Sequence, residues 1–382
     1  MTRRGLRIGG RLDRYVGGLF VSSYATAFFL VVGLFLILDM ASNLDGYVEP
    51  WPGGYRAPGF LIARYYLLDV PFLFLQIAPF VTLVAGLFTV SKLLRVNETV
   101  ASLAAGVSSW RLLAPVFVLG ALCGLGMFGL SEAAAKGLAN RRDALHYVLE
   151  SKRFDLVYSN LRVRDLSGSV AIIDEFRPAI PLPPEAGDVP VPPAPEIKGL
   201  QAVMRSRAQQ FSDTQAARAT YEPRGDRMGW KLEGGVREEV AGSQITTPVE
   251  WLDGFEFSPG LAITYWRAHE DPLDLSFSEV RELARRDPDN VVFQTLMQYH
   301  LTFPLANLVL LLVGVPILLR HDRRRSALGL AGGVLLCVFY FATDFVLRNM
   351  GIQGTLDPLL AAWLPVLLFG SLGLVLYDSM QS

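Results

Sequence analysis

The sequence predicts a membrane α-helical protein with six transmembrane helices in a 3+3 arrangement and an inserted β-rich domain. Its 382 residues are 51% hydrophobic and only 19% charged, a balance that favours a membrane protein over a soluble globular one. The apolar residues occur in blocks, and residues 131–300 interrupt these blocks with the composition of a soluble domain. We therefore expect two transmembrane halves, over 1–130 and 301–382, and an inserted domain over 131–300.

Six stretches are long and apolar enough to cross a bilayer, which requires about 20 helical residues. The first is preceded by five arginines, as a secretory signal would be, but its apolar run is too long and no convincing cleavage site follows it. We therefore expect it to remain attached as an anchor. The six predicted spans cover residues 15–38, 67–90, 112–130, 301–319, 327–347 and 359–377.

The lysines and arginines of the short loops predict the orientation of the spans. Basic residues gather before the first span, between the second and third, and between the fourth and fifth. These segments, and with them both termini, are expected to be cytoplasmic. Residues 131–300 then lie on the far side, because long domains cross a membrane largely regardless of their charge.

Short β-like runs separated by turn signals recur within residues 131–300 and predict a sandwich, jelly roll or open barrel. A proline-dense stretch, 178–195, predicts an extended loop, either an insertion without function or a partner-binding motif. Near the end of the domain, Ser276 and Glu279 fit a capping box ahead of a short helix that extends through Ala284. The expected strands cover 169–176, 199–205, 217–221, 229–232 and 235–240.

No sequence pattern in the chain indicates catalysis or a metal site. Phosphate-binding GxxxxGK[ST] loops, GxSxG elbows, HExxH motifs and paired-carboxylate motifs do not occur, and the four histidines have no ligand spacing. Both cysteines, Cys123 and Cys337, lie inside apolar runs, which disfavours a disulfide framework or a zinc site. If the protein uses ATP, another chain must hydrolyse it.

Two features of the spans stand out. Asp344 and Arg348 are spaced i, i+4 in the fifth span, so they can pair on one helical face, or they can contact a substrate or a gate. Four glycines in the third span predict close approach of a neighbouring helix: Gly120, Gly124, Gly126 and Gly129.

The loop between the second and third spans reads NETVASLAAGVSSWR, residues 97–111. Asn97 suits an N-cap, Glu98 and Thr99 start a helix at its positive end, and Gly106 suits a left-handed stop. Ser108 supplies a second cap immediately afterwards. This predicts a short cytoplasmic helix over 98–105 whose mostly small side chains carry Leu103 as a larger knob. It can dock on another surface or rest on the ends of the spans.

Four segments of the chain carry a resemblance to a known family. They are LDRY at 12–15, the loop residues 98–108, FPL at 303–305 and PLLAAWLP at 358–365. Together with the order of parts, they resemble the LptF/LptG permeases of lipopolysaccharide export, and LDRY leans slightly toward the LptG branch. The resemblance covers essentially the whole chain.

The resemblance implies a non-catalytic permease of an ABC transporter in the cell inner membrane. Its expected partners are an LptB-like ATPase dimer that binds the ATP, a paralogous LptF/LptG permease and an LptC-like protein. Lipopolysaccharide or a related glycolipid would be extracted from the inner membrane, received by the β-jelly roll and passed to a periplasmic bridge. The loop 97–111 would be the coupling helix on the ATPase, through Glu98, Thr99, Leu103 and Gly106.

The substrate contacts are predicted differently from the family pattern. Family members often carry basic residues near the outer end of the first span, where this chain has Asp39 and Asp45. Charge alone then favours other basic residues as lipid contacts. Asp344 is a separate candidate, because the resemblance implies gates between the first span of one permease and the fifth span of the other. These candidate substrate or gate residues are Arg56, Arg64, Lys136, Asp344 and Arg348.

Two other classes of protein stay open. A membrane-anchored periplasmic enzyme would need a polar catalytic cluster among the outward strands, and a sensor or scaffold would need a cytoplasmic effector domain. The sequence displays neither feature. Co-purification with an ATPase discriminates between the permease and both alternatives.

Overall fold

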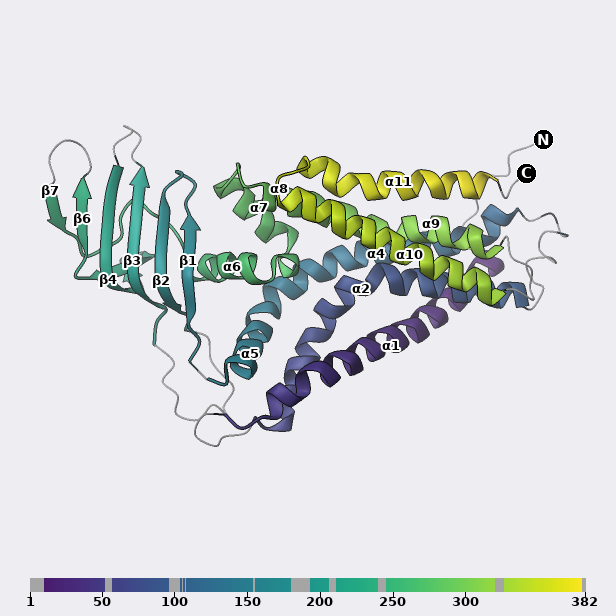
Figure 1. Cartoon of the computed structure of the whole chain (residues 1–382), viewed down its shortest axis with the longest axis horizontal. Helices are drawn as coiled ribbons and strands as arrows, with labels where there is room; N and C mark the ends of the chain where they lie inside the picture. The colour runs from purple at the N-terminus through teal and green to yellow at the C-terminus, as the bar shows by residue number, and fades with distance from the viewer. Residues whose placement is uncertain are drawn as a thin grey trace. The chain divides into compact units, whose positions relative to one another are not determined.

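A computed structural model describes residues 10–51, 57–95, 104, 106, 108–153, 155–179, 193–205, 211–239, 245–319 and 326–379 (Figure 1). The chain forms two compact units. The helical unit comprises Met1–Ser42, Val70–Ala133 and Gln294–Ser382, and the β unit comprises Asn43–Asp69 and Ala134–Phe293. The β unit thus includes 43–69, which the sequence placed in the N-terminal transmembrane half.

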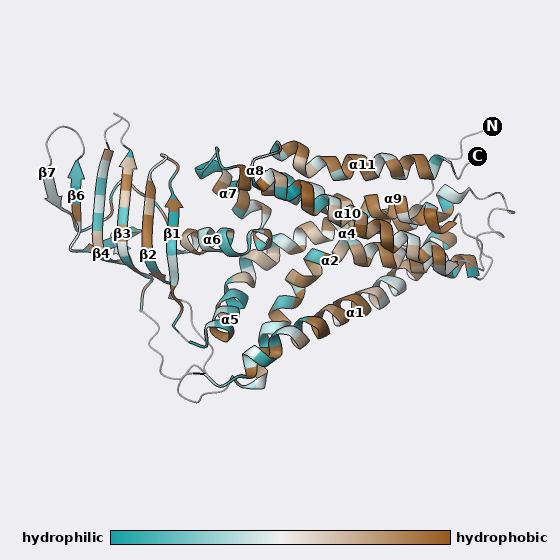
Figure 2. Ribbon diagram, in the orientation of Figure 1, coloured by the Kyte–Doolittle hydropathy of each residue, from teal (hydrophilic) through white to brown (hydrophobic). Residues whose placement is uncertain are grey.

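Six helices among the described residues are long and apolar enough to cross a membrane, which confirms the predicted number. Figure 2 shows hydrophobic residues along most of their length. Most of the helices run past the predicted ends, because the helical conformation continues through more polar flanking turns. They are α1 (Arg11–Val48), α2 (Gly59–Arg95), α4 (Ser109–Gly137), α8 (Val291–Thr302) continued through η3 (Phe303–Leu305) into α9 (Ala306–Leu319), α10 (Ser326–Ile352) and α11 (Pro358–Asp378).

Glycines let the helices of the helical unit approach closely. A Cβ atom on Gly120 would lie 2.3 Å from the Leu311 side chain, and one on Gly124 would lie 2.6 Å from the Pro304 carbonyl oxygen. The predicted close packing is therefore confirmed at these two positions. The prediction of close packing is wrong within this chain for Gly126 and Gly129, where a Cβ would meet no described atom within 4 Å. Offsets of two and five residues from Gly124 turn them about 200° and 140° away.

The described residues of the β unit form one antiparallel sheet of seven strands in the order β1-β2-β3-β4-β6-β7, with β5 also paired to β4. Strands β5 and β6 pair with different parts of the long β4, along the same side of it. They therefore lie end to end and are separated by Gly234 and Gly235. The inserted β-rich domain is confirmed, and all its described strands lie in a single sheet. Their bounds are β1 (Tyr158–Arg164), β2 (Val170–Arg177), β3 (Glu196–Arg205), β4 (Phe211–Arg224), β5 (Arg227–Glu233), β6 (Val236–Glu239) and β7 (Ile245–Pro248).

A distorted row crosses the first four strands and changes which residues face the core. Asn160 and Gly199 adopt positive φ angles of 57° and 64° there, and the Asp174 side chain would lie 2.0 Å from a Cβ on Gly199. On either side of this row, paired residues are buried together across the sheet. One buried row contains Leu161, Ile173, Leu200 and Ala216, and the other, three residues away along each strand, contains Tyr158, Phe176, Ile197 and Ala219.

Three α-helices and one 3-10 turn among the described residues lie wholly within the β unit. They are α5 (Ala139–Ser151), α6 (Pro259–Glu270), η2 (Pro272–Asp274) and α7 (Phe277–Arg286). The β unit also includes the end of α1, the first part of α2, the end of α4 and the start of α8. The predicted capping box is confirmed at α7, where Glu279 N donates to Ser276 Oγ and Ser276 N donates to Glu279 Oε2. The helix runs two residues beyond the predicted Ala284. We did not predict α5, α6, η2, β1 or β7.

Candidate functional site

The predicted coupling segment is only partly within the described residues. Glu98, Thr99 and Leu103 lie outside them. Gly106 has a φ of 79°, the left-handed conformation expected of a helix stop. Ser108 caps the following helix as predicted, because Arg111 N donates to Ser108 Oγ at 3.4 Å.

An aromatic cluster fixes the chain where it leaves this segment. Trp110 is the second residue of α4, and its ring stacks on Phe117 with 5.9 Å between centroids. Tyr377, near the end of α11, meets Trp110 edge-on at 5.4 Å. Such aromatic pairs stabilise by about 0.5–1.5 kcal/mol beyond their buried area. The start of α4 is therefore tied to the last turn of α11.

The described candidate substrate or gate residues are divided between the two units. Asp344 and Arg348 belong to the helical unit, and the predicted i, i+4 pair is present, with Arg348 Nη1 3.9 Å from Asp344 Oδ2. Arg348 also lies over the Tyr299 ring, 4.5 Å from its centroid. Arg64 and Lys136 are exposed residues of the β unit. Arg56 lies outside the described residues.

A buried charge cluster in the β unit was not predicted. Arg142 on α5 sits among three carboxylates: its Nε lies 2.9 Å from Asp69 Oδ1 on α2, and its Nη1 contacts Asp274 Oδ2 on η2 and lies 3.5 Å from Asp143 Oδ1. Arg267 on α6 lies 2.6 Å from Glu279 Oε1 and 3.5 Å from Asp143 Oδ2. We call these six residues the charge cluster: Asp69, Arg142, Asp143, Arg267, Asp274 and Glu279.

The charge cluster holds four carboxyl groups and two guanidinium groups. Arg142, Asp143 and Arg267 are all buried, and burial of charge is costly unless each group is paired. Desolvation raises the pKa of Asp143 to about 7, although the guanidiniums of Arg142 and Arg267 lower it and Asp274 raises it further. Asp143 therefore takes up a proton near neutral pH, which reduces the excess of negative charge.

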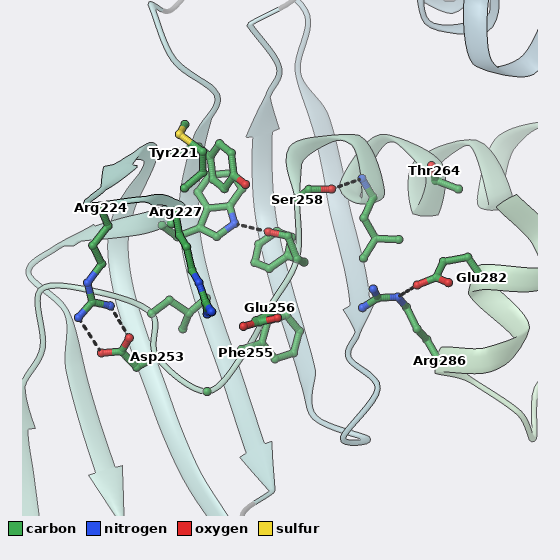
Figure 3. A pocket seen from close by; sticks show the side chains of 17 residues that line it. Tyr221, Arg224, Arg227, Asp253, Phe255, Glu256, Ser258, Thr264, Glu282 and Arg286 are labelled. Atoms are coloured by element: carbon green, nitrogen blue, oxygen red, sulfur yellow. Dashed lines mark hydrogen bonds and ion pairs between the residues drawn. The ribbon is translucent and has the colours of Figure 1, made fainter.

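A cavity of about 1080 Å³ opens in the same unit beside β4 and β5 (Figure 3). Its inner wall is aromatic: Trp230, Phe255 and Phe257 are buried, and the Trp230 indole N–H donates to the Phe257 carbonyl oxygen at 2.9 Å. Ser258, the N-cap of α6, also lines the cavity. The volume lies just above the range of about 300–1,000 Å³ that is usual for ligand pockets.

The rim of the cavity carries charged residues. Arg224 pairs with Asp253 on one side, and Arg286 lies 2.9 Å from Glu282 on the other. Arg227 lines the rim as an exposed residue. A lining that combines aromatic residues with arginines and carboxylates suits an amphipathic ligand with charged groups.

No group of three or more potential ligands within the described ranges is arranged to hold a metal ion. Comparison with individual curated proteins gave no match. The family model for the lipopolysaccharide export system permease LptF/LptG, by contrast, matches residues 14–379, which is nearly the whole chain. This match covers both groups of apolar helices and the inserted sheet, so the chain belongs to the LptF/LptG family, and it is a multi-pass inner-membrane protein with a role in lipopolysaccharide export.

Proposed function

We propose that this chain is a non-catalytic permease subunit that works with a separate ATPase dimer and a second, paralogous permease to extract lipopolysaccharide or a related glycolipid from the inner membrane. The observation that carries this proposal is the family match over residues 14–379. The architecture supports it, because six membrane-capable helices flank one sheet domain.

The orientation follows from the basic loops. Both termini and the segment 96–107 are cytoplasmic, and the β unit is periplasmic, where an LptC-like protein receives the lipid. The segment 96–107 then faces the ATPase. The aromatic cluster of Trp110, Phe117 and Tyr377 supports this role, because it connects the end of that segment to α11.

The cavity of the β unit is the place where we expect the extracted lipid to be received. Trp230, Phe255 and Phe257 form an aromatic base beneath the cavity, and the arginines of the rim offer partners for phosphate groups. Lipid entry would displace water from apolar surface, which is favourable at roughly 25 cal/mol per Å².

Reconstitution tests the proposed function. The chain is co-expressed with the ATPase and the second permease of the same cell, purified in detergent and placed in lipid nanodiscs that contain lipopolysaccharide. We expect the three proteins to co-elute, and ATP to release labelled lipid to a soluble periplasmic acceptor. A chain that brings down no ATPase, or a complete complex that hydrolyses ATP without releasing lipid, contradicts the proposal.

A further inference from the structure

The helix α2 is shared by both units of the chain. Its first part, up to Asp69, belongs to the β unit, and the part from Val70 to Arg95 belongs to the helical unit. The segment 96–107 follows directly after Arg95. One helix of about 55 Å therefore links the predicted ATPase-facing segment to the β unit.

Asp69 marks the point at which α2 is held by the β unit. Its carboxylate lies 2.9 Å from Arg142 Nε, and its side chain is 13% exposed. Arg142 is in turn held by Asp274 and lies near Asp143, so the partner of Asp69 is fixed by two further carboxylates from α5 and η2. An ion pair whose guanidinium is already oriented loses little side-chain entropy on forming.

A proline follows this point of attachment. Pro71 lies inside α2, two residues beyond Asp69, and its missing N–H leaves the Leu67 carbonyl without its intrahelical partner. Prolines are the usual places at which helices bend. The boundary between the two units falls between these residues, at Asp69 and Val70. The outer end of α2 is thus attached to the β unit on one side of the proline, and the part from Val70 onward is packed within the helical unit on the other.

The charges of the cluster show that Asp69 is not needed for neutrality. Four carboxyl groups face two guanidiniums, so removal of the Asp69 charge lowers an excess of negative charge. Arg142 keeps Asp274 and Asp143 as partners when Asp69 is neutral. A purely structural account therefore predicts little effect of Asp69→Asn on stability, or a small gain.

We propose that the Asp69–Arg142 pair is a clamp that fixes the outer end of α2 to the β unit, so that movement started at the cytoplasmic end of α2 is passed to the β unit during transport. Asp69 and Arg142 are positioning residues, since they act through α2 and not on the lipid. This inference rests on the proposed function for its transport step, but the clamp itself does not.

The test compares the wild-type complex with Asp69→Asn, Asp69→Glu and a control, Glu49→Gln. Glu49 forms an exposed ion pair with Lys152 in the same unit, at 2.5 Å. Each complex is reconstituted in nanodiscs, and four quantities are measured: melting temperature, ATPase rate, lipid released per ATP hydrolysed, and hydrogen exchange of residues 59–69.

Asp69→Asn should keep the wild-type melting temperature and an ATPase rate within about twofold of the wild type. It should release at least fivefold less lipid per ATP, with at least fivefold faster exchange over 59–69. Asp69→Glu should restore most of the release, and Glu49→Gln should match the wild type.

The outcomes separate the clamp from the proposed function. Unchanged exchange over 59–69 in Asp69→Asn overturns the clamp, whatever transport does. Faster exchange over 59–69 with normal lipid release overturns the role of the clamp in coupling. A joint loss of melting temperature, ATPase rate and lipid release shows that the pair has a structural role only, and this outcome also overturns the role of the clamp in coupling. If the wild-type complex releases no lipid with ATP, the proposed function fails, while the exchange measurement still decides whether the clamp exists.

Discussion

Replacing Arg267 with methionine tests how the charge cluster stabilises the β unit. The Arg267 side chain is 4% exposed and lies between Asp143 and Glu279, which are 6% and 17% exposed. Methionine fills similar space but leaves both carboxyl groups without that guanidinium. Removal of one partner from a buried ion pair costs about 3–5 kcal/mol, because an uncompensated charge remains. For a domain of this size, the loss lowers the melting temperature by about 10 °C.

The assay is thermal unfolding of the full chain in detergent, followed by tryptophan fluorescence. Four of the six tryptophans lie in the β unit: Trp51, Trp230, Trp251 and Trp266. The matched control is Arg224→Met, whose ion pair with Asp253 is exposed on both sides, at 47% and 58%. Exposed pairs contribute about 0–1 kcal/mol, so this variant should melt within about 2 °C of the wild type. Adding Asp143→Asn to Arg267→Met should recover part of the loss, because one unpaired carboxyl group is then neutral. Equal melting temperatures for the two arginine variants would refute the reasoning.

Three further predictions concern pH, helix packing and coupling. Burial raises the pKa of Asp143 from 3.8 to about 7, so between these two pH values the folded form keeps a proton that the unfolded form releases. The contribution of this group to stability therefore falls as the pH rises from about 4 to about 7, by about 4 kcal/mol at most. The melting temperature of Asp143→Asn relative to wild type should accordingly be higher at pH 8 than at pH 5. Gly124→Ala places a Cβ 2.6 Å from the Pro304 oxygen and should reduce stability by about 1–3 kcal/mol, whereas Gly126→Ala should not, as measured by melting in detergent. Glu98→Lys should reduce co-purification of the ATPase or its stimulated activity at least tenfold, and wild-type assembly in that variant would remove Glu98 from the coupling site.

The number and order of the spans could be predicted because apolar length is a property of the sequence alone. The ends of the helices could not. Helix α1 continues past Asp39 and Asp45 to Val48, because a helix needs hydrogen-bonded turns, not apolar residues, to go on. The same limit applies to Gly126 and Gly129, whose small size is visible in the sequence while the face of the helix that meets a neighbour is not.

The strands were predicted less completely because the alternation of buried and exposed residues is broken at one row of the sheet. In β1 the buried residues Tyr158 and Leu161 are three apart, with Asn160 at a positive φ between them. Strict alternation of buried and exposed residues, with a period of two, therefore cannot describe both halves of β1 at once. The paired positions in β2 and β3 show the same offset, from Ile173 to Phe176 and from Ile197 to Leu200. Alternation is a reliable signal only where the backbone is regular, and this sheet is regular on both sides of the row but not across it.

The charge cluster could not be predicted for a different reason. Arg142 and Asp143 look like residues of a solvent-exposed helix face, and only partners from α2, α6, η2 and α7, which are distant in the sequence, make their burial tolerable. The four carboxyl groups are held in different ways. Glu279 closes the capping box of α7, Asp274 is in direct contact with Arg142, and Asp143 lies between both guanidiniums and holds a proton near neutrality. Asp69 adds negative charge to a cluster that already has enough, at the place where α2 passes from one unit to the other. The pair of Asp69 with Arg142 at that boundary is the contact that we propose attaches α2 to the β unit.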